Sequence, residues 1–368
     1  MKKLLFFVLT VLGAVGMSKA QSMNADELEW KDAAELTVLG KIVPDTFEPF
    51  SRLPVSLRER TREPVWKLGR NSAGLCVKFT TDAKAMSLRW SNVFGYFRDN
   101  ICPVNAHGLD VYVWHEGGWR FLGATRIKRG QKLNVTDFRF DKLGDGLKEF
   151  MVYLSTYDGV EKLEIGIPKG GWIEPSSFDS PRARKPVIMY GTSILQGGSA
   201  SRPGLIGSNR LERMLDRQVI NLGFSGNAHL DLEIAELMAS YPDPGVYVLD
   251  NLPNCGAELV REREEAFFRV LREAHPKVPV VFVENPYYPR VKYNAGQEEA
   301  IKAKNQALRE VFGSLKKAGE KNIYYVKGDK LLPPDGEGTV DGTHFTDQGF
   351  DSYVSVLYPV LNKICKKL

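Results

Sequence analysis

Residues 70–168 show a hydrophobic pattern with a period of two. Apolar and polar side chains alternate in three stretches: Leu75–Phe79, Met86–Trp90 and Leu163–Ile167. This alternation places the apolar residues on one face of a β-strand. The Asp158-Gly159 pair between two such stretches predicts a hairpin turn. Short strands with frequent turns predict an all-β, jelly-roll-like sandwich domain over residues 21–180.

After Lys185 the pattern changes to continuous apolar stretches that alternate with amphipathic ones. The apolar stretches are 186–190, 219–222, 246–249, 278–283 and 323–326. The stretches with helical periodicity are 205–215, 230–240, 257–274, 295–317 and 348–366. Buried parallel strands covered by helices predict a flavodoxin-like three-layer α/β/α domain with five parallel strands over residues 185–368. The Gly-, Pro- and Ser-containing segment 168–186 is the expected linker.

The chain begins with a segment typical of a signal peptide. Two lysines precede the apolar stretch Leu4–Met17, and Ser18-Lys19-Ala20 has small residues at the positions that signal peptidase recognises. As a helix, the stretch would cover about 21 Å, less than a bilayer core of roughly 30 Å. We therefore expect cleavage after residue 20 and a periplasmic or secreted protein. The alternative is an uncleaved N-terminal anchor.

The net charge of the chain bears on its binding partners, and its cysteines bear on disulfide formation. Removal of residues 1–20 takes away three lysines and no acid, so the formal net charge falls from +5 to +2. Such a small charge gives no reason to expect binding to nucleic acid or to an anionic membrane. The four cysteines are Cys76, Cys102, Cys255 and Cys365. They form no Cys-x-x-Cys pair, and their sequence is compatible with two disulfides in any of three pairings or with free thiols.

Ser193 follows the first apolar stretch of the second half, in the sequence Gly191-Thr192-Ser193. In a parallel sheet, the loop after a strand lies at the carboxyl edge, where ligands bind. A serine hydroxyl exposed there becomes a nucleophile when a neighbouring base activates it. Gly-Thr-Ser is also an ordinary turn sequence, so the interpretation depends on finding that base.

Asp341 and His344 lie together on a polar loop before the last helical stretch. Their spacing lets one turn bring the carboxylate to the imidazole Nδ1–H and leave Nε2 for a serine. The other histidines are His107, His115, His229 and His275. Of these, His229 follows the second strand and is the alternative base. Only His344 has a carboxylate at this spacing, so we predict a triad of Ser193, His344 and Asp341.

Two further loops offer hydrogen-bond donors for an oxyanion. Gly226 ends the sequence Asn221–Gly226 after the second apolar stretch, and glycine lets a backbone N–H approach a reacting oxygen closely. Asn254 follows the third stretch and could donate from its side-chain amide. With the Ser193 N–H, these groups would form an oxyanion hole with three donors. Each residue alone is a common turn residue, but together they occur in order at successive strand ends.

This order of Ser193, Gly226, Asn254 and Asp341/His344 resembles the four sequence blocks of the SGNH (GDSL-like) hydrolases. The sequences YGTSILQGGSASRPG and VINLGFSGN are similar to a bacterial subgroup in which a β-sandwich with a Gly-x-Asp-Leu-Tyr motif precedes the hydrolase domain. Here the motif reads Gly108-Leu109-Asp110-Val111-Tyr112, with valine in place of leucine. Thr192 replaces the aspartate of the commoner first block, and Pro253-Asn254-Cys255 replaces Gly-Asn-Asp in the third. Neither change removes an expected catalytic group.

The resemblance implies a serine esterase that removes short acyl groups, most simply acetyl, from a small-molecule or glycan ester. The loop Gln196–Arg202 is small and polar, which suits hydroxyl-rich ligands. The alternatives are a lipase- or thioesterase-like acylhydrolase, or a carbohydrate-binding protein with an inactive hydrolase half that uses Trp114 and Trp119. The sequence has no Gly-x-Ser-x-Gly elbow, Walker loop, Rossmann glycine pattern or zinc helix, and no cofactor or metal is indicated.

Overall fold

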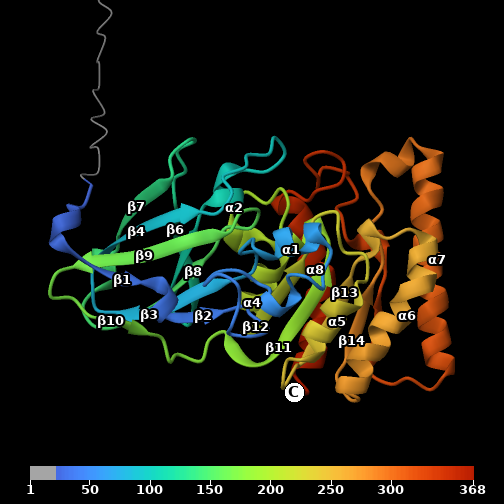
Figure 1. Ribbon diagram of the computed structural model, residues 1–368. Coiled ribbons are helices and arrows are strands. Elements are labelled where there is room, and N and C mark those ends of the chain that lie inside the picture. The colour runs from blue at the N-terminus through green and yellow to red at the C-terminus, as the bar shows by residue number, and fades with distance from the viewer. Residues whose placement is uncertain (1–21) are drawn as a thin grey trace, which may run out of the picture.

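The computed structural model describes residues 22–368, in which a β-rich half packs beside an α/β half (Figure 1). The predicted signal peptide lies outside the described residues. Among the residues described, no helix combines the length and the apolar character needed to cross a bilayer. All four cysteines are free thiols, and Cys76 and Cys255 are buried.

The β-rich half contains two antiparallel sheets. One has the order β1 (Leu28–Asp32), β9 (Val160–Pro168), β4 (Ala85–Asn92) and β7 (Leu133–Arg139). The other has the order β10 (Ile173–Pro175), β3 (Cys76–Thr81), β8 (Lys148–Tyr153), β5 (Asp110–His115) and β6 (Gly118–Ala124), with β2 (Thr37–Leu39) paired to β3. Apolar residues from both sheets, among them Phe79, Trp90 and Ile165, form one buried core. The alternating pattern therefore arises because each strand turns one face toward this core.

The hairpin predicted at Asp158-Gly159 is wrong. Strands β8 and β9 on either side of this turn belong to different sheets, so the chain crosses between layers here. Asp158 is buried, and its carboxylate accepts hydrogen bonds from the backbone N–H groups of Phe94 and Gly95. The aspartate therefore fixes a distant loop, a role that the local Asp-Gly pattern does not reveal.

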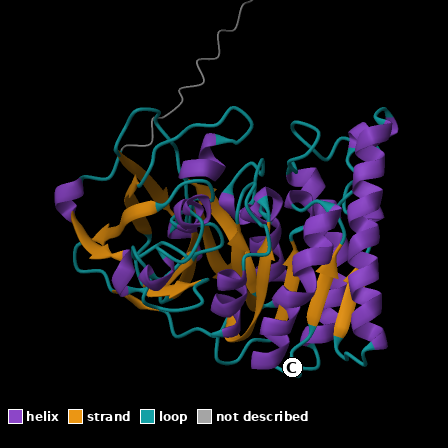
Figure 2. Ribbon diagram, turned by 45° about the vertical axis from the view of Figure 1, so that its right-hand side comes forward, coloured by secondary structure: helices purple, strands orange, loops and turns teal. Residues whose placement is uncertain are grey.

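The α/β half is built on a five-stranded parallel sheet. Its order is β12 (Arg217–Gly223), β11 (Arg182–Gly191), β13 (Val246–Asp250), β14 (Val280–Val283) and β15 (Ile323–Val326). Helices α5 (Leu232–Ala239), α6 (Ala257–Ala274) and α7 (Ala295–Lys317) cover one face, and α4 (Gly207–Leu215) and α8 (Asp347–Cys365) cover the other (Figure 2). Successive residues of β11 point to opposite faces, Ile188 toward the first group and Met189 toward the second. This is the predicted three-layer α/β/α fold.

The two halves share part of their core. Ile42, Leu53 and Val65, which lie between β2 and β3 in a segment that includes helix α1 (Glu63–Gly69), pack into the α5–α7 side of the α/β half. Arg52 is buried and donates to the carbonyl oxygens of Asn221 (3.1 Å) and Gly223 (2.8 Å) at the end of β12. In the segment expected to be a linker, β10 pairs with β3, so this stretch is partly ordered sheet.

Candidate active site

The order of the parallel strands brings the predicted site residues to one edge of the sheet. Strand β11 lies between β12 and β13, and Gly191 at its end is level with Gly223 and Asp250 on those neighbours. The loops that begin after these three residues contain Ser193, Gly226 and Asn254. Because the strands are parallel, all three loops leave the sheet at its carboxyl edge.

Ser193 is the first residue of the short helix α3 (Ser193–Gln196). The Thr192 side chain caps this helix by accepting from the Ile194 N–H, which explains why threonine suits the position. The Ser193 hydroxyl lies 3.0 Å from Nε2 of His344. The residue is 6% exposed, so its hydroxyl is nearly buried yet lies beside the half-buried His344 ring.

His344 and Asp341 form the pair that the spacing predicted. Nδ1 of His344 lies 2.7 Å from Oδ2 of Asp341, and the other carboxylate oxygen accepts from the backbone N–H groups of Thr343 (3.0 Å) and His344 (2.9 Å). A carboxylate only accepts, so Nδ1 carries the ring proton and Nε2 is left to accept from Ser193. The structure thus connects Asp341, His344 and Ser193 in one continuous series of hydrogen bonds.

Asp341 is held in its ionised form. Partial burial raises the pKa of this carboxyl, but hydrogen bonds from the His344 backbone, the Asn100 amide and the His344 ring outweigh burial. Their net effect is a pKa well below the usual aspartate range. The carboxylate therefore remains charged and able to stabilise an imidazolium.

The two predicted oxyanion loops lie next to each other. The Asn254 side-chain oxygen accepts from the backbone N–H of Ala228, two residues beyond Gly226, at 3.3 Å. This contact uses the oxygen of the amide and leaves its NH₂ group as a donor. Gly226 has φ +69°, and no atom lies within 4 Å of the position that a Cβ would take. Its backbone therefore borders open space.

Three residues that sequence reasoning missed contact Asp341 or Ser193. Asn100 of the β-rich half donates to Oδ2 of Asp341 at 3.0 Å, and Tyr157 donates from its hydroxyl to the Ser193 carbonyl at 2.9 Å. Arg290 donates to the Asp341 carbonyl. Burial raises the pKa of Tyr157 to about 12, so its phenol keeps the proton that it donates. These residues lie 36 to 241 positions from their partners, and no local motif marks them.

Two of the other histidines and the two tryptophans considered for sugar binding occupy other environments. Among the histidines, His107 is buried against Asp158, with Nδ1 3.1 Å from the carboxylate, and His275 bonds the Ala239 carbonyl. The rings of Trp114 and Trp119 pack edge-to-face at 5.5 Å, and both also contact Phe178. The two tryptophans are therefore partly buried against each other instead of forming an open platform for sugars.

The loop Gln196–Arg202 differs from its expected role. Gln196, Gly197, Gly198 and Ala200 are buried, so this stretch is not an open, polar surface for hydroxyl-rich ligands. A Cβ on Gly198 would lie 2.7 Å from the Tyr157 hydroxyl oxygen and 3.2 Å from the His344 ring. The small residues let the loop pass between two active-site side chains.

No group of three or more His, Cys, Asp and Glu side chains in the part of the chain that the structure describes is placed to hold a metal ion. The chemistry that this arrangement supports is nucleophilic attack by a serine hydroxyl with a histidine as base.

Each half of the chain matches the model of a known protein family. Residues 184–362 match the model of the GDSL-like lipase/acylhydrolase family. Residues 28–173 match the GxDLY model, described as the N-terminus of SGNH-hydrolase-type esterases. No curated protein is similar enough to the chain to count as a match.

Similar solved structures share the fold of both halves over nearly the whole chain. A protein from Bacteroides ovatus described as a GDSL-like lipase is 34% identical, with a TM-score of 0.86 over 92% of this chain and 98% of its own. A salicylyl-acyltransferase from a tetracycline biosynthetic pathway is 18% identical, with a TM-score of 0.73 over 93% and 98%. A family two carbohydrate esterase from Cellvibrio japonicus is 12% identical, with a TM-score of 0.59 over 92% and 98%. The last two show the fold alone. The chain thus belongs to the GDSL-like lipase/acylhydrolase family and is a carboxylic ester hydrolase.

Proposed function

We propose that the protein is a serine esterase in which Ser193, His344 and Asp341 act as a catalytic triad. The observation that carries this proposal is the series of hydrogen bonds from Asp341 through His344 to the Ser193 hydroxyl, 2.7 Å and 3.0 Å long. His344 Nε2 takes the hydroxyl proton as the serine oxygen attacks the ester carbonyl. Asp341 holds the ring in the required tautomer and stabilises its charged form.

The reaction then proceeds in two halves. The first tetrahedral intermediate carries its negative charge on the former carbonyl oxygen, to which the N–H groups of Ser193 and Gly226 and the Asn254 amide donate. The intermediate collapses to an acyl-serine while His344 protonates the leaving alcohol. His344 next removes a proton from water, which attacks the acyl-serine and releases the carboxylic acid.

The proposed substrate is a short acyl ester, most simply an acetyl group, on a carbohydrate. Two observations support a carbohydrate. The sequence blocks resemble a subgroup of carbohydrate esterases, and 92% of the chain matches the fold of the family two carbohydrate esterase from Cellvibrio japonicus. The Gln196–Arg202 loop gives no physical support, since four of its seven residues are buried.

A chain-length series of p-nitrophenyl esters tests this function. We expect fastest release from the acetate, loss of activity in Ser193→Ala, and acetate release from acetylated xylan or another acetylated glycan. A serine-reactive fluorophosphonate should label Ser193 alone. Preference for acyl chains of eight carbons or more, without acetate release from any glycan, would identify a lipase-like enzyme. Labelling of Ser225 instead of Ser193 would refute the proposed nucleophile.

We also propose export, on the basis of the charged start, the apolar stretch Leu4–Met17 and Ser18-Lys19-Ala20. N-terminal sequencing of the protein recovered outside the cytoplasm should begin at Gln21. An intact Met1 on a membrane-bound product would show that the segment is an anchor.

A further inference from the structure

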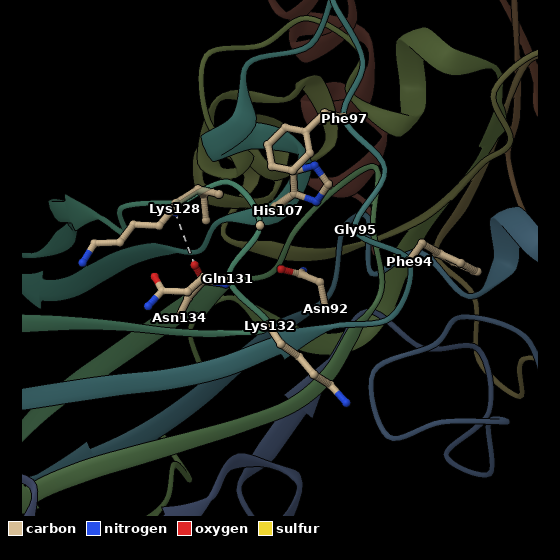
Figure 3. Close-up of a pocket in the computed structure, with 11 residues that line it drawn as sticks. Asn92, Phe94, Gly95, Phe97, His107, Lys128, Gln131, Lys132 and Asn134 are labelled. Atoms are coloured by element: carbon tan, nitrogen blue, oxygen red, sulfur yellow. Dashed lines mark hydrogen bonds between the residues drawn. The ribbon is translucent and has the colours of Figure 1, made fainter.

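A hollow of about 270 Å³ lies in the β-rich half, and none of the proposed triad residues lines it (Figure 3). The end of β4 and the loop after it form one side, and the loop between β6 and β7 forms the other. Its volume is slightly below the range of roughly 300–1,000 Å³ that is usual for sites of drug-sized ligands. A site of this size suits a sugar unit or two better than a long acyl chain.

The lining of the hollow combines amides with positive charge. Asn92, Gln131 and Asn134 provide amide groups, and Lys128 and Lys132 are exposed at its edge. In Figure 3 the two lysine side chains, both from the loop between β6 and β7, extend away from each other at the edge of the hollow. None of the eleven lining residues, all within the described part of the chain, is acidic. Amides are suited to hydroxyl groups, and ammonium groups attract an anion.

The sequence reinforces this charge. The segment from Arg126 to Lys132 has four basic residues and no acid within seven positions. Its Arg129 guanidinium lies over the ring of Phe97, another lining residue, at 5.1 Å from the ring centre. The loop between β6 and β7 therefore adds positive charge at the edge of the hollow, where the guanidinium packs on an aromatic ring.

The inner wall of the hollow is built from fixed parts. His107 lines it and is buried, with Nδ1 on Asp158 and its ring 4.4 Å from that of Phe97. Its Nε2 is buried and has no hydrogen-bond partner among the described residues. The negative charge of Asp158 is directed toward backbone N–H groups of Phe94 and Gly95. The wall is thus rigid and leaves one imidazole nitrogen unsatisfied, which a bound hydroxyl or water would relieve.

The loop that lines the hollow also reaches the proposed active site. Phe97 lies in the hollow, whereas Asn100, three residues later, donates to Asp341 and accepts from the Ser199 hydroxyl. Three extended residues span at most about 11 Å. A glycan long enough to bridge this distance could occupy both places at once.

From these observations we propose that the hollow binds an acidic sugar unit, a uronate, of the glycan whose acyl ester enters the active site. This inference rests on the proposed esterase function and defines its substrate class more narrowly. The positive charge of Lys128 and Lys132 would attract the carboxylate to the edge of the hollow. The ring hydroxyls would bond Oδ1 of Asn92 and the NH₂ group of Asn134, since the other atom of each amide bonds the Gly159 carbonyl or the Lys128 N–H. The bound unit adds affinity for the polymer and takes no part in the chemical step.

The test compares acidic and neutral acetylated xylo-oligosaccharides of equal length, one series carrying glucuronic acid. Lys128→Glu combined with Lys132→Glu should raise KM for the acidic series about tenfold and leave kcat unchanged, since a few screened charge contacts are lost or reversed. KM for the neutral series and hydrolysis of p-nitrophenyl acetate should not change. The matched control, Lys142→Glu with Lys169→Glu, makes the same charge change at exposed sites outside the hollow.

Binding is measured independently of hydrolysis in the Ser193→Ala protein by calorimetry. We expect a glucuronate-bearing oligosaccharide to bind more tightly than its neutral counterpart, with an affinity that falls as salt rises. In the lysine double variant this advantage over the neutral oligosaccharide should be lost. Equal affinities, a matching loss in the control variant, or tighter binding of a sulfated oligosaccharide would overturn the proposal. A protein that binds the acidic oligosaccharide but hydrolyses no ester would contradict the proposed function and leave the hollow assigned.

Discussion

The hydrogen-bond partners of Asp341 come from one local and two distant parts of the chain. The His344 ring and backbone are local, Arg290 follows β14, and Asn100 belongs to the β-rich half. A histidine adjacent to a carboxylate is common, whereas a triad also requires that the carboxylate keep its charge and direction. Asn100 contributes to both, because its amide donates to the same carboxylate oxygen that faces the ring.

Replacement of Asn100 should affect the chemical step more than substrate binding. Asn100→Ala removes one hydrogen bond to a charged group, and we expect kcat to fall on the order of tenfold with KM little changed. Asn100→Asp places a second carboxylate beside Asp341, which favours the protonated imidazolium that cannot accept from Ser193. The acid limb of kcat/KM should then move to higher pH. An unchanged pH profile in Asn100→Asp would show that Asn100 has only a structural role.

Asn254 allows the oxyanion role to be separated from folding. Asn254→Ala should lower kcat about a hundred- to thousandfold, as expected for the loss of one oxyanion donor. Asn254→Asp keeps an oxygen that can accept from Ala228 N–H but loses the NH₂ donor. It should lose activity to a similar extent and keep its melting temperature. Substantial activity in Asn254→Asp would mean that the amide does not donate to the oxyanion.

The sequence predicted the local parts of this site and missed the distant ones, for a physical reason. Asp341 and His344 are three residues apart, so their contact follows from one turn. Ser193 and Asn254 were placed by the rule that parallel strands end at a common edge. Asn100 and Tyr157 reach Asp341 and Ser193 only through the packing of the two halves, which no spacing along the chain encodes.

At the level of elements, the predicted bounds agree with the structure where the local sequence itself marks the start or the end of the element. Helices α6 and α7 occupy the predicted residues, since each combines an amphipathic pattern with a local stop or start, such as the Asn294 side chain that accepts from Gln297 N–H. At Asp158-Gly159, the same turn chemistry serves a crossover between sheets. The choice between a hairpin and a crossover is made by strand pairing, which is not local.

Helix α6 also contains a buried acid with a testable consequence. Glu264 is fully buried and accepts from the Asn251 amide at 2.9 Å. Burial raises the pKa of Glu264 to about 7, although the Asn251 hydrogen bond opposes this. Its second carboxyl oxygen and the Asn251 oxygen are both buried without a partner among the described residues, and a proton on the carboxyl would give them a donor.

The sign of the pH effect follows from proton uptake. Between the unfolded pKa of about 4.3 and the folded value near 7, the folded state holds a proton that the unfolded state has released. The contribution of Glu264 to stability is thus fully present below the unfolded pKa and is lost as pH rises through about 7. Glu264→Gln stays neutral, so its melting temperature relative to the parent should rise between pH 5 and pH 8. A difference in melting temperature that is constant with pH would contradict this effect. The control is Glu262→Gln, a change at an exposed position of the same helix.

At the level of the whole molecule, the Gly108–Tyr112 motif joins the two halves. Asp110 is fully buried, and one of its oxygens accepts from Arg202 (2.6 Å) and from the Gly204 N–H (2.7 Å). Arg202 also donates to the Tyr112 hydroxyl at 2.9 Å. The aspartate and tyrosine of the motif therefore bind the segment that follows helix α3, whereas the Val111 side chain points into the sandwich core. This explains why valine replaces leucine there without affecting the contact.

Loss of this contact should weaken both stability and activity. Asp110→Asn leaves Arg202 without its charged partner, and breaking a buried ion pair costs about 3 kcal/mol. Because Arg202 and Gly204 lie close after Ser193, we expect kcat to fall together with the free energy of unfolding. Glu310→Gln, which breaks the exposed Arg261–Glu310 pair, is the control and should hardly change either quantity. Arg202→Met combined with Asp110→Asn should lower kcat and the free energy of unfolding by less than the sum of the single changes. Each single change already breaks the same ion pair. Two results would contradict this: additive effects of the two changes, or an Asp110→Asn protein that unfolds no more easily than Glu310→Gln. Either would show that the motif is not the contact that holds the segment after helix α3 to the β-rich half.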